Sequence, residues 1–185
     1  IQPNSKFPDM PALVQFVHDN GLKFGIYSSP WVSPWGCTKE QAFSDWGGGE
    51  LIGSSAGEID PNYSTYCGKY VGVEKYEAND VKQWIEWQID YLKYDWTPTD
   101  PESLERMGSL LKKAPRDIVL SICTGARLEH VEAYKKWANL WRGAADTEDN
   151  WNNILITGFD SEDINCRENW RPYIGPGNWY DLDML

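Results

Sequence analysis

The amino-acid sequence predicts an α/β protein that forms an incomplete portion of a (β/α)₈ TIM barrel. Amphipathic helical segments alternate with short apolar strands, a pattern typical of a parallel sheet whose faces are covered by helices. Polar or small residues stand at the predicted carboxyl ends of the strands: Ser28, Asp95, Cys123 and Asp146. Barrels carry their active sites at that edge, which favours a barrel over a doubly wound sheet. A barrel needs eight strands and the sequence supplies about five, so we expect the chain to be part of a larger domain.

The first helix is predicted to begin at Met10. Its apolar residues have the i, i+3, i+4, i+7 spacing of an amphipathic helix: Met10, Leu13, Val14 and Val17. Asp9 is a candidate N-cap and Gly21 a stop signal. The segment LKFGIYSS, residues 22–29, is expected to follow as a buried strand.

The same unit recurs along the chain. The apolar stripe of the second helix consists of Val81, Trp84, Ile85 and Ile89, and that of the third consists of Leu104, Met107 and Leu111. Asp100 and Pro101 suit the N-cap and first turn of the third helix. A fourth helix is expected over 131–137. The predicted strands after these helices are YLKYD (91–95), DIVLSIC (117–123) and ANLWRGAAD (138–146), and YDLDML (180–185) is expected to be strand as well.

Residues 30–75 interrupt this rhythm and are predicted to be an insertion within one domain that covers 1–185. The insertion contains WGGGELIGSSAG, which lacks the Gly-Lys-Ser/Thr ending of a phosphate-binding loop. A long insertion at the carboxyl edge of a barrel is typically a lid or a pocket wall. Trp31 would give such a wall a flat face on which a sugar can stack.

Charge and composition exclude several classes of partner. The chain has 17 Lys and Arg against 28 Asp and Glu, a net charge of −11, which repels nucleic acid and anionic lipid surfaces. No apolar run approaches the roughly 20 residues of a membrane span. Four Cys without a CxxC pair, and only two His, argue against a metal centre, and no cofactor is expected. The even number of Cys favours an exported protein, whether secreted, periplasmic or lysosomal.

The acidic residues at two strand ends have a possible catalytic use. An ionised carboxylate in a buried position costs several kcal/mol unless it is paired or hydrogen-bonded, so Asp95 must lie in a solvated pocket or in a salt bridge. If Asp95 and Asp146 project into one barrel mouth, they form the carboxylate pair that glycoside cleavage requires. Spacing alone leaves the alternative open that either residue is salt-bridged or caps a helix. The 11 Trp and 10 Tyr residues also suit a carbohydrate ligand.

Four segments resemble, in order, the motifs of the α-galactosidase family of retaining glycosidases, glycoside hydrolase family 27. They are GLKFGIYSS, DYLKYDW, WRGAADTEDNW and DLDML. The resemblance implies that the chain supplies about strands three to seven of the catalytic barrel. It also implies that Asp95 is the nucleophile, that Asp146 is the acid/base, and that Lys93 and Arg142 bind sugar hydroxyls. The implied ligand is an oligosaccharide or glycoconjugate.

The residue chemistry agrees with those roles and leaves alternatives. Lys93 lies two residues before Asp95 in a strand, so both share a face and the cation would favour the ionised nucleophile. Arg142 could instead form an ion pair with Asp146 or Glu148. Asp149 is predicted to be a helix cap or to lie behind the site.

The chain departs from the family after the strand that ends at Cys123. Galactosidases of the family carry Glu-Trp there to read the sugar 2-hydroxyl, whereas this chain has Thr124 and Gly125. Cys123 and Thr124 are therefore the candidate substrate contacts at this strand. The family's usual disulfide partner after the nucleophile is absent, so we predict a Cys37–Cys67 disulfide across the insertion. Cys123 is expected to be a buried thiol near Cys166.

The sequence thus predicts a retaining glycoside hydrolase acting on terminal α-galactose or a close relative, such as N-acetylgalactosamine or β-L-arabinopyranose. Retention requires carboxyl groups about 5 to 5.5 Å apart, and a separation of roughly 6.5 to 9.5 Å would indicate an inverting enzyme. A non-catalytic carbohydrate-binding protein on a degenerate barrel is the rival interpretation. The sugar, its linkage and the oligomeric state stay open.

Overall fold

The structure is a computed structural model that describes residues 3–28, 77–95, 100–123, 125–144, 146–159 and 167–183. The predicted insertion, with Trp31 and the Cys37–Cys67 pair, lies outside the described residues. Thr124 and Cys166 lie outside them as well. The described elements, in chain order, are α1 (Met10–Asp19), β1 (Gly25–Ser28), α3 (Glu77–Trp87), β2 (Tyr91–Asp95), α4 (Pro101–Lys113), β3 (Val119–Cys123), η2 (Leu128–His130), α5 (Val131–Trp137), β4 (Leu140–Arg142), α6 (Trp151–Gly158), α7 (Arg167–Trp170), η3 (Arg171–Tyr173) and β5 (Trp179–Asp181).

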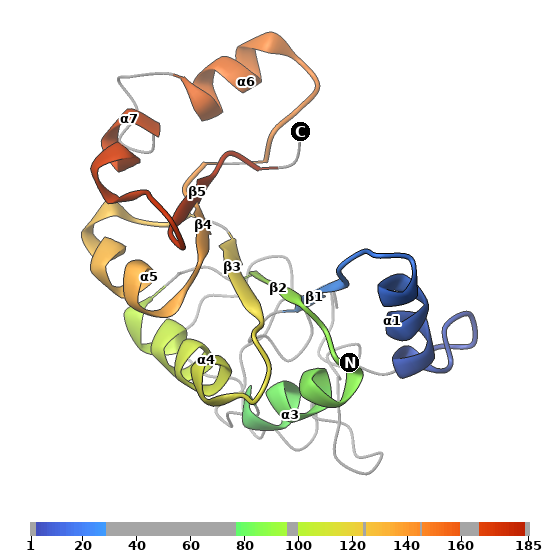
Figure 1. Cartoon of the computed structure of the whole chain (residues 1–185). Coiled ribbons are helices and arrows are strands. Elements are labelled where there is room, and N and C mark those ends of the chain that lie inside the picture. The colour runs from blue at the N-terminus through green and yellow to red at the C-terminus, as the bar shows by residue number, and fades with distance from the viewer. Residues whose placement is uncertain are drawn as a thin grey trace, which may run out of the picture. The chain divides into compact units, whose positions relative to one another are not determined.

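The strands form one five-stranded sheet in the order β1-β2-β3-β4-β5. β3 pairs in parallel with β4, and β4 pairs in parallel with β5, with Arg142 opposite Asp181. Figure 1 shows β3, β4 and β5 following one another in the sheet. A doubly wound sheet reverses its strand order at a switch point. The unbroken order, with helices between successive strands, is that of an incomplete α/β barrel.

Sequence signals account for the helix starts. The Asp9 carboxylate accepts a hydrogen bond from the Ala12 N–H at 2.9 Å and so caps α1, as predicted. Gly21, just past the end of α1, has a φ of +74°, a conformation that favours glycine. At α4, the Asp100 carboxylate accepts from the Ser103 N–H at 2.7 Å. The predicted cap and the helix-starting Pro101 are therefore confirmed.

The chain packs as two compact units. The first comprises Ile1–Leu92 and Leu110–Ile118, and the second comprises Lys93–Ser109 and Val119–Leu185. The buried apolar side chains of the first unit include Val14, Val81, Trp84, Trp87, Ile89, Leu92 and Leu111. In the second unit, an aromatic cluster of Tyr134, Trp141, Trp170 and Tyr180 packs β4 and β5 against α5 and α7, with ring centroids 5.3 to 6.3 Å apart.

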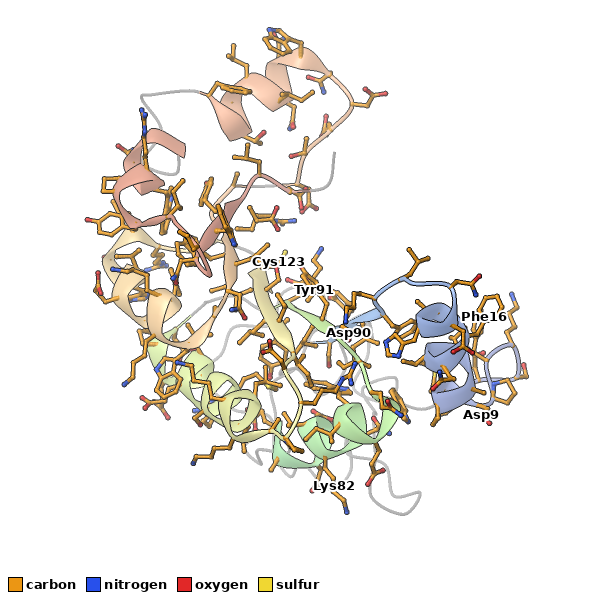
Figure 2. The ribbon with its side chains drawn as sticks, viewed as in Figure 1. Asp9, Phe16, Lys82, Asp90, Tyr91 and Cys123 are labelled. Carbon is orange, nitrogen blue, oxygen red and sulfur yellow. The ribbon has the colours of Figure 1, made fainter. Side chains whose placement is uncertain are left out.

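A buried carboxylate ties the first unit together at the start of β2. Asp90, labelled in Figure 2, accepts hydrogen bonds from the Phe24 N–H at 2.8 Å and from Arg116 at 2.5 Å, and its Oδ2 lies 2.7 Å from His18 Nε2. Arg116 also donates through Nε to the Ile89 carbonyl at 2.8 Å. Asp90 thus joins α1, the entry to β1 and the turn after α4. It lies at the opposite end of β2 from Asp95.

Four of the predicted strands have other bounds in the structure. The strand expected over 22–29 is β1, Gly25–Ser28, and the strand expected over 180–185 is β5, Trp179–Asp181. The strand expected over 138–146 ends at Arg142, and the strand expected over 117–123 begins at Val119. Asp146 therefore lies in the loop beyond β4. In that loop, Asn150 caps α6 by accepting from the Asn153 N–H at 2.9 Å, so of the two roles predicted for Asp149 the helix cap was wrong.

Candidate active site

The end of β2 carries two of the predicted site residues. Along Tyr91–Asp95 the side chains alternate, because Leu92 and Tyr94 are buried while Lys93 and Asp95 are partly exposed. This alternation confirms that Lys93 and Asp95 share the strand face turned away from the buried side chains. Lys93 and Asp95 both belong to the second compact unit, which also contains Asp146. A carboxylate and an ammonium group thus occupy one face at the end of this strand.

Arg142, the last residue of β4, is the centre of an ionic cluster. Its side chain is only 2% exposed. It donates through Nη2 to Asp146 Oδ1 at 2.7 Å and through Nη1 to Asp183 Oδ1. The Asp146 ion pair that the sequence left open as an alternative is therefore present. The role of Arg142 as a ligand for sugar hydroxyls stays a prediction.

The electrostatics of the site keep Arg142 charged. Burial acts to lower the pKa of the guanidinium, but Cys123, Asp183 and Asp146 together raise its pKa above the ordinary value. A permanently charged, planar donor can hold two carboxylates at once because its N–H groups form a rigid fork.

Asp146 is positioned by this guanidinium and by its loop rather than by a strand. Its side chain is 78% exposed. The Asn153 side chain bridges the backbone of this loop. Its amide group donates to the Asp146 carbonyl at 3.4 Å, and its Oδ1 accepts from the Glu148 N–H at 2.8 Å. An exposed carboxyl group that is bound at one oxygen is held in position and can still contact a substrate.

Asp183 is a site residue that the sequence reasoning missed. It follows β5, its side chain is 2% exposed, and its φ of +79° is unusual for a residue other than glycine. Its Oδ2 accepts from the Thr147 N–H at 2.7 Å. The signal was in the DLDML motif: an aspartate at or near the end of an apolar strand is the criterion that singled out Asp95, which ends β2, and Asp183 lies two residues after β5.

The remaining predicted contacts lie around β3. Cys123, labelled in Figure 2, ends β3 and is a buried thiol, as expected. Cys123 is one of the groups that raise the pKa of the Arg142 guanidinium. Gly125, in place of the family's tryptophan, has a φ of +68°. Contacts of Cys123 and Thr124 with substrate stay predictions.

No cluster of three or more His, Cys, Asp or Glu in the described part of the chain could hold a metal ion. Among the described helices, none is both long and apolar enough to cross a membrane.

Comparison with known proteins identifies the family. The family model described as alpha galactosidase A matches residues 58–185. The chain belongs to this family, glycoside hydrolase family 27. The resemblance inferred from the motifs is therefore confirmed.

The alpha-galactosidase of Oryza sativa subsp. japonica is 29% identical over 99% of this chain and 36% of its own length. Alpha-galactosidase 2 of Arabidopsis thaliana is 31% identical over 98% of this chain and 38% of its own length. The chain thus spans less than half the length of these family members.

A solved structure of a β-L-arabinopyranosidase from Geobacillus stearothermophilus, in complex with arabinose, shares the fold. Its TM-score is 0.74 at 23% identity, over 98% of this chain and 43% of that one. Together with the strand order, this likeness confirms the predicted incomplete α/β barrel.

The fork of Arg142 gives a first testable prediction. In the complete enzyme, Arg142→Lys is expected to lower kcat/KM by roughly 10- to 100-fold, because an ammonium group cannot bind Asp146 and Asp183 in the planar geometry of the guanidinium. Steady-state kinetics would measure the loss, and denaturant unfolding would show whether the variant is folded under assay conditions. An unchanged kcat/KM would make Arg142 a structural residue only.

Proposed function

We propose that the complete enzyme is a retaining glycoside hydrolase that releases terminal α-galactose, or a closely related sugar, from an oligosaccharide or glycoconjugate. The observation that carries this proposal is the coexistence of two carboxylates in one compact unit of a family 27 chain. Asp95 ends β2, and Asp146 is bound to the buried Arg142 just beyond β4. The α-galactosidase names of the plant relatives support the substrate class.

The mechanism uses the two carboxyl groups in different ways. In the first step, an ionised Asp95 oxygen attacks the anomeric carbon, while Asp146 gives its proton to the departing glycosidic oxygen. In the second step, Asp146 takes a proton from water, and the water oxygen displaces Asp95 from the anomeric carbon. Two inversions at one carbon give overall retention. The chemistry requires no metal ion or cofactor.

A non-catalytic carbohydrate-binding protein is the second candidate. The observation in its favour is the replacement of the family's Glu-Trp pair by Thr124 and Gly125. Against it stands the coexistence of Asp95 and Asp146, because a degenerate binding protein need not retain both carboxylates. Export to the cell exterior or an equivalent compartment, and the Cys37–Cys67 disulfide, remain parts of the proposal.

Trapping the glycosyl-enzyme tests this function directly. A fluorinated galactosyl substrate that slows the second step is expected to leave the sugar covalently attached to the peptide that contains YLKYDW. Mass spectrometry of the digested enzyme would locate the label on Asp95, and an Asp95→Asn variant serves as the unlabelled control. A label on Asp146 or Asp149 would contradict the assignment. Absence of both label and turnover would favour the binding protein.

A further inference from the structure

Asp183 and Asp146 share one guanidinium but differ in their surroundings. Arg142 binds Asp183 through Nη1 and Asp146 through Nη2, so one cation faces two carboxylates. The side chains of Arg142 and Asp183 are each 2% exposed, whereas that of Asp146 is 78% exposed. Water screens the exposed pair more than the buried one. Of the two carboxylates, the buried Asp183 is therefore the stronger counter-ion of Arg142.

This arrangement bears on proton donation. A lone guanidinium at hydrogen-bonding distance favours the ionised form of a carboxyl group. An acid catalyst, in contrast, must hold its proton until the glycosidic oxygen departs. A second carboxylate that neutralises the guanidinium removes this conflict and leaves the arginine as a hydrogen-bond donor.

Asp183 is also held firmly in place. Its Oδ2 accepts from the N–H of Thr147, the residue that follows Asp146, at 2.7 Å. Thr147 Oγ1 donates to the Leu182 carbonyl at 2.9 Å, and the Asp183 N–H donates to Asp181 at 2.9 Å. These bonds hold Asp183 at a φ of +79°. An uncommon backbone conformation of this kind persists only where the surroundings fix it.

The neighbouring titratable groups do not replace Asp183. Cys123, Glu148, Tyr180 and Asp181 are titratable residues on the strands and the loop that carry the cluster. Cys123 interacts with Arg142 from β3, and Asp181 accepts the Asp183 N–H. The Glu148 carboxylate accepts from Asn150 at 3.2 Å. Tyr180 packs against Gly143, where an added Cβ would meet its hydroxyl at 2.8 Å.

We propose that Asp183 is a positioning residue that neutralises Arg142 and anchors the Asp146 loop, so that Asp146 can act as the proton donor. The inference rests on the proposed function, in which Asp146 is the acid/base. It adds a residue that works through Arg142 and Thr147 rather than by touching the substrate.

The test is Asp183→Asn, which removes the charge while keeping the size of the side chain. Two substrates are compared: a nitrophenyl galactoside, whose leaving group needs little protonation, and a galactosyl disaccharide, whose leaving group needs a proton. We expect kcat/KM to fall at least about 10-fold further for the disaccharide than for the nitrophenyl substrate. The alkaline side of the kcat/KM profile should also move to lower pH. Equal losses and an unshifted profile would overturn the proposal.

Matched variants separate charge from structure. Glu148→Gln removes one charge from the same loop without touching Arg142, and the ratio between the two substrates should not change. Thr147→Val removes the bond to Leu182 without a change of charge, and both substrates should be affected equally. A shifted ratio in either variant would contradict a role specific to the charge of Asp183.

A double variant covers the case in which Asp183→Asn does not fold. Arg142→Gln with Asp183→Asn replaces the buried ion pair by a neutral pair, which proteins commonly tolerate better than a lone buried charge. No uncompensated guanidinium remains in this double variant. The alkaline side of its kcat/KM profile should therefore not lie at lower pH than that of the wild type. An alkaline side shifted to lower pH would overturn the proposal.

Asp146→Ala distinguishes this inference from the proposed function. If that variant loses both substrates equally, Asp146 is not the acid and the proposed function fails. If Asp146→Ala loses the disaccharide selectively while Asp183→Asn does not, only the inference about Asp183 is wrong.

Discussion

Asp95→Ala is expected to abolish turnover of the complete enzyme, with kcat/KM falling by on the order of 10⁴-fold or more, the scale on which loss of a covalent nucleophile is felt. The reason lies in the strand. Asp95 ends β2 on the same face as Lys93, so that a rigid backbone and a nearby cation hold an ionised oxygen ready for the anomeric carbon. Alanine leaves that place empty without disturbing the buried Leu92 and Tyr94.

A small anion should partly restore this variant. Azide can occupy the space left by the carboxylate and attack the anomeric carbon, while Asp146 still protonates the departing oxygen. The product would be a glycosyl azide of inverted configuration, which nuclear magnetic resonance identifies. Asp149→Ala, which removes an exposed carboxylate from the loop after β4, is the matched control and should keep near-normal activity. Near-normal activity of Asp95→Ala, or a restored product of retained configuration, would rule out Asp95 as the nucleophile.

Periodicity predicted most of the described fold because each element has its own local signal. The apolar stripes of α1 and α4 each begin just after a capping aspartate, and β2 and β3 coincide with runs of apolar residues. The helix α6 was not predicted, although Asn150 caps it and Trp151, Ile154 and Leu155 have the i, i+3, i+4 spacing of a helix. Its Trp151 and Ile156 side chains are 67% and 54% exposed, so they add nothing to a buried stripe.

The site was predictable only where one residue carries the chemistry. Asp95 and Asp146 follow apolar segments and are conspicuous as carboxylates, and the family motifs supplied their roles. Asp183 depends on a contact with Arg142, 41 residues earlier in the chain, and on a backbone conformation that tertiary bonds impose. The end of β4 was misplaced for a related reason: Gly143 and Ala144 are buried like strand residues, yet the pairing with β5 ends at Arg142.

Asp90→Asn is expected to destabilise the protein, and by an amount that depends on pH. Burial alone would raise the pKa of the Asp90 carboxyl, but the Phe24 N–H, His18 and Arg116 lower it from 3.8 to about 2. Lys23, 3.5 Å away, is 83% exposed and adds little. The Asp90 side chain is only 10% exposed. A carboxyl group with a lowered pKa stabilises the folded state when it is ionised, here by about 2 kcal/mol.

The sign of the effect fixes the pH window. Because the folded pKa lies below the unfolded one, this stabilisation is fully present above about pH 4 and is lost as the pH falls towards about 2. Urea unfolding of wild type and Asp90→Asn at several pH values should therefore give a difference of about 2 kcal/mol near neutrality that shrinks in acid. Asp117→Asn, at an exposed carboxylate one residue after Arg116, should stay within about 0.5 kcal/mol of wild type throughout. A difference that persists unchanged at pH 2 would mean that Asp90 acts by its shape and hydrogen bonds, and that its charge contributes nothing to holding α1 and β1 against the start of β2.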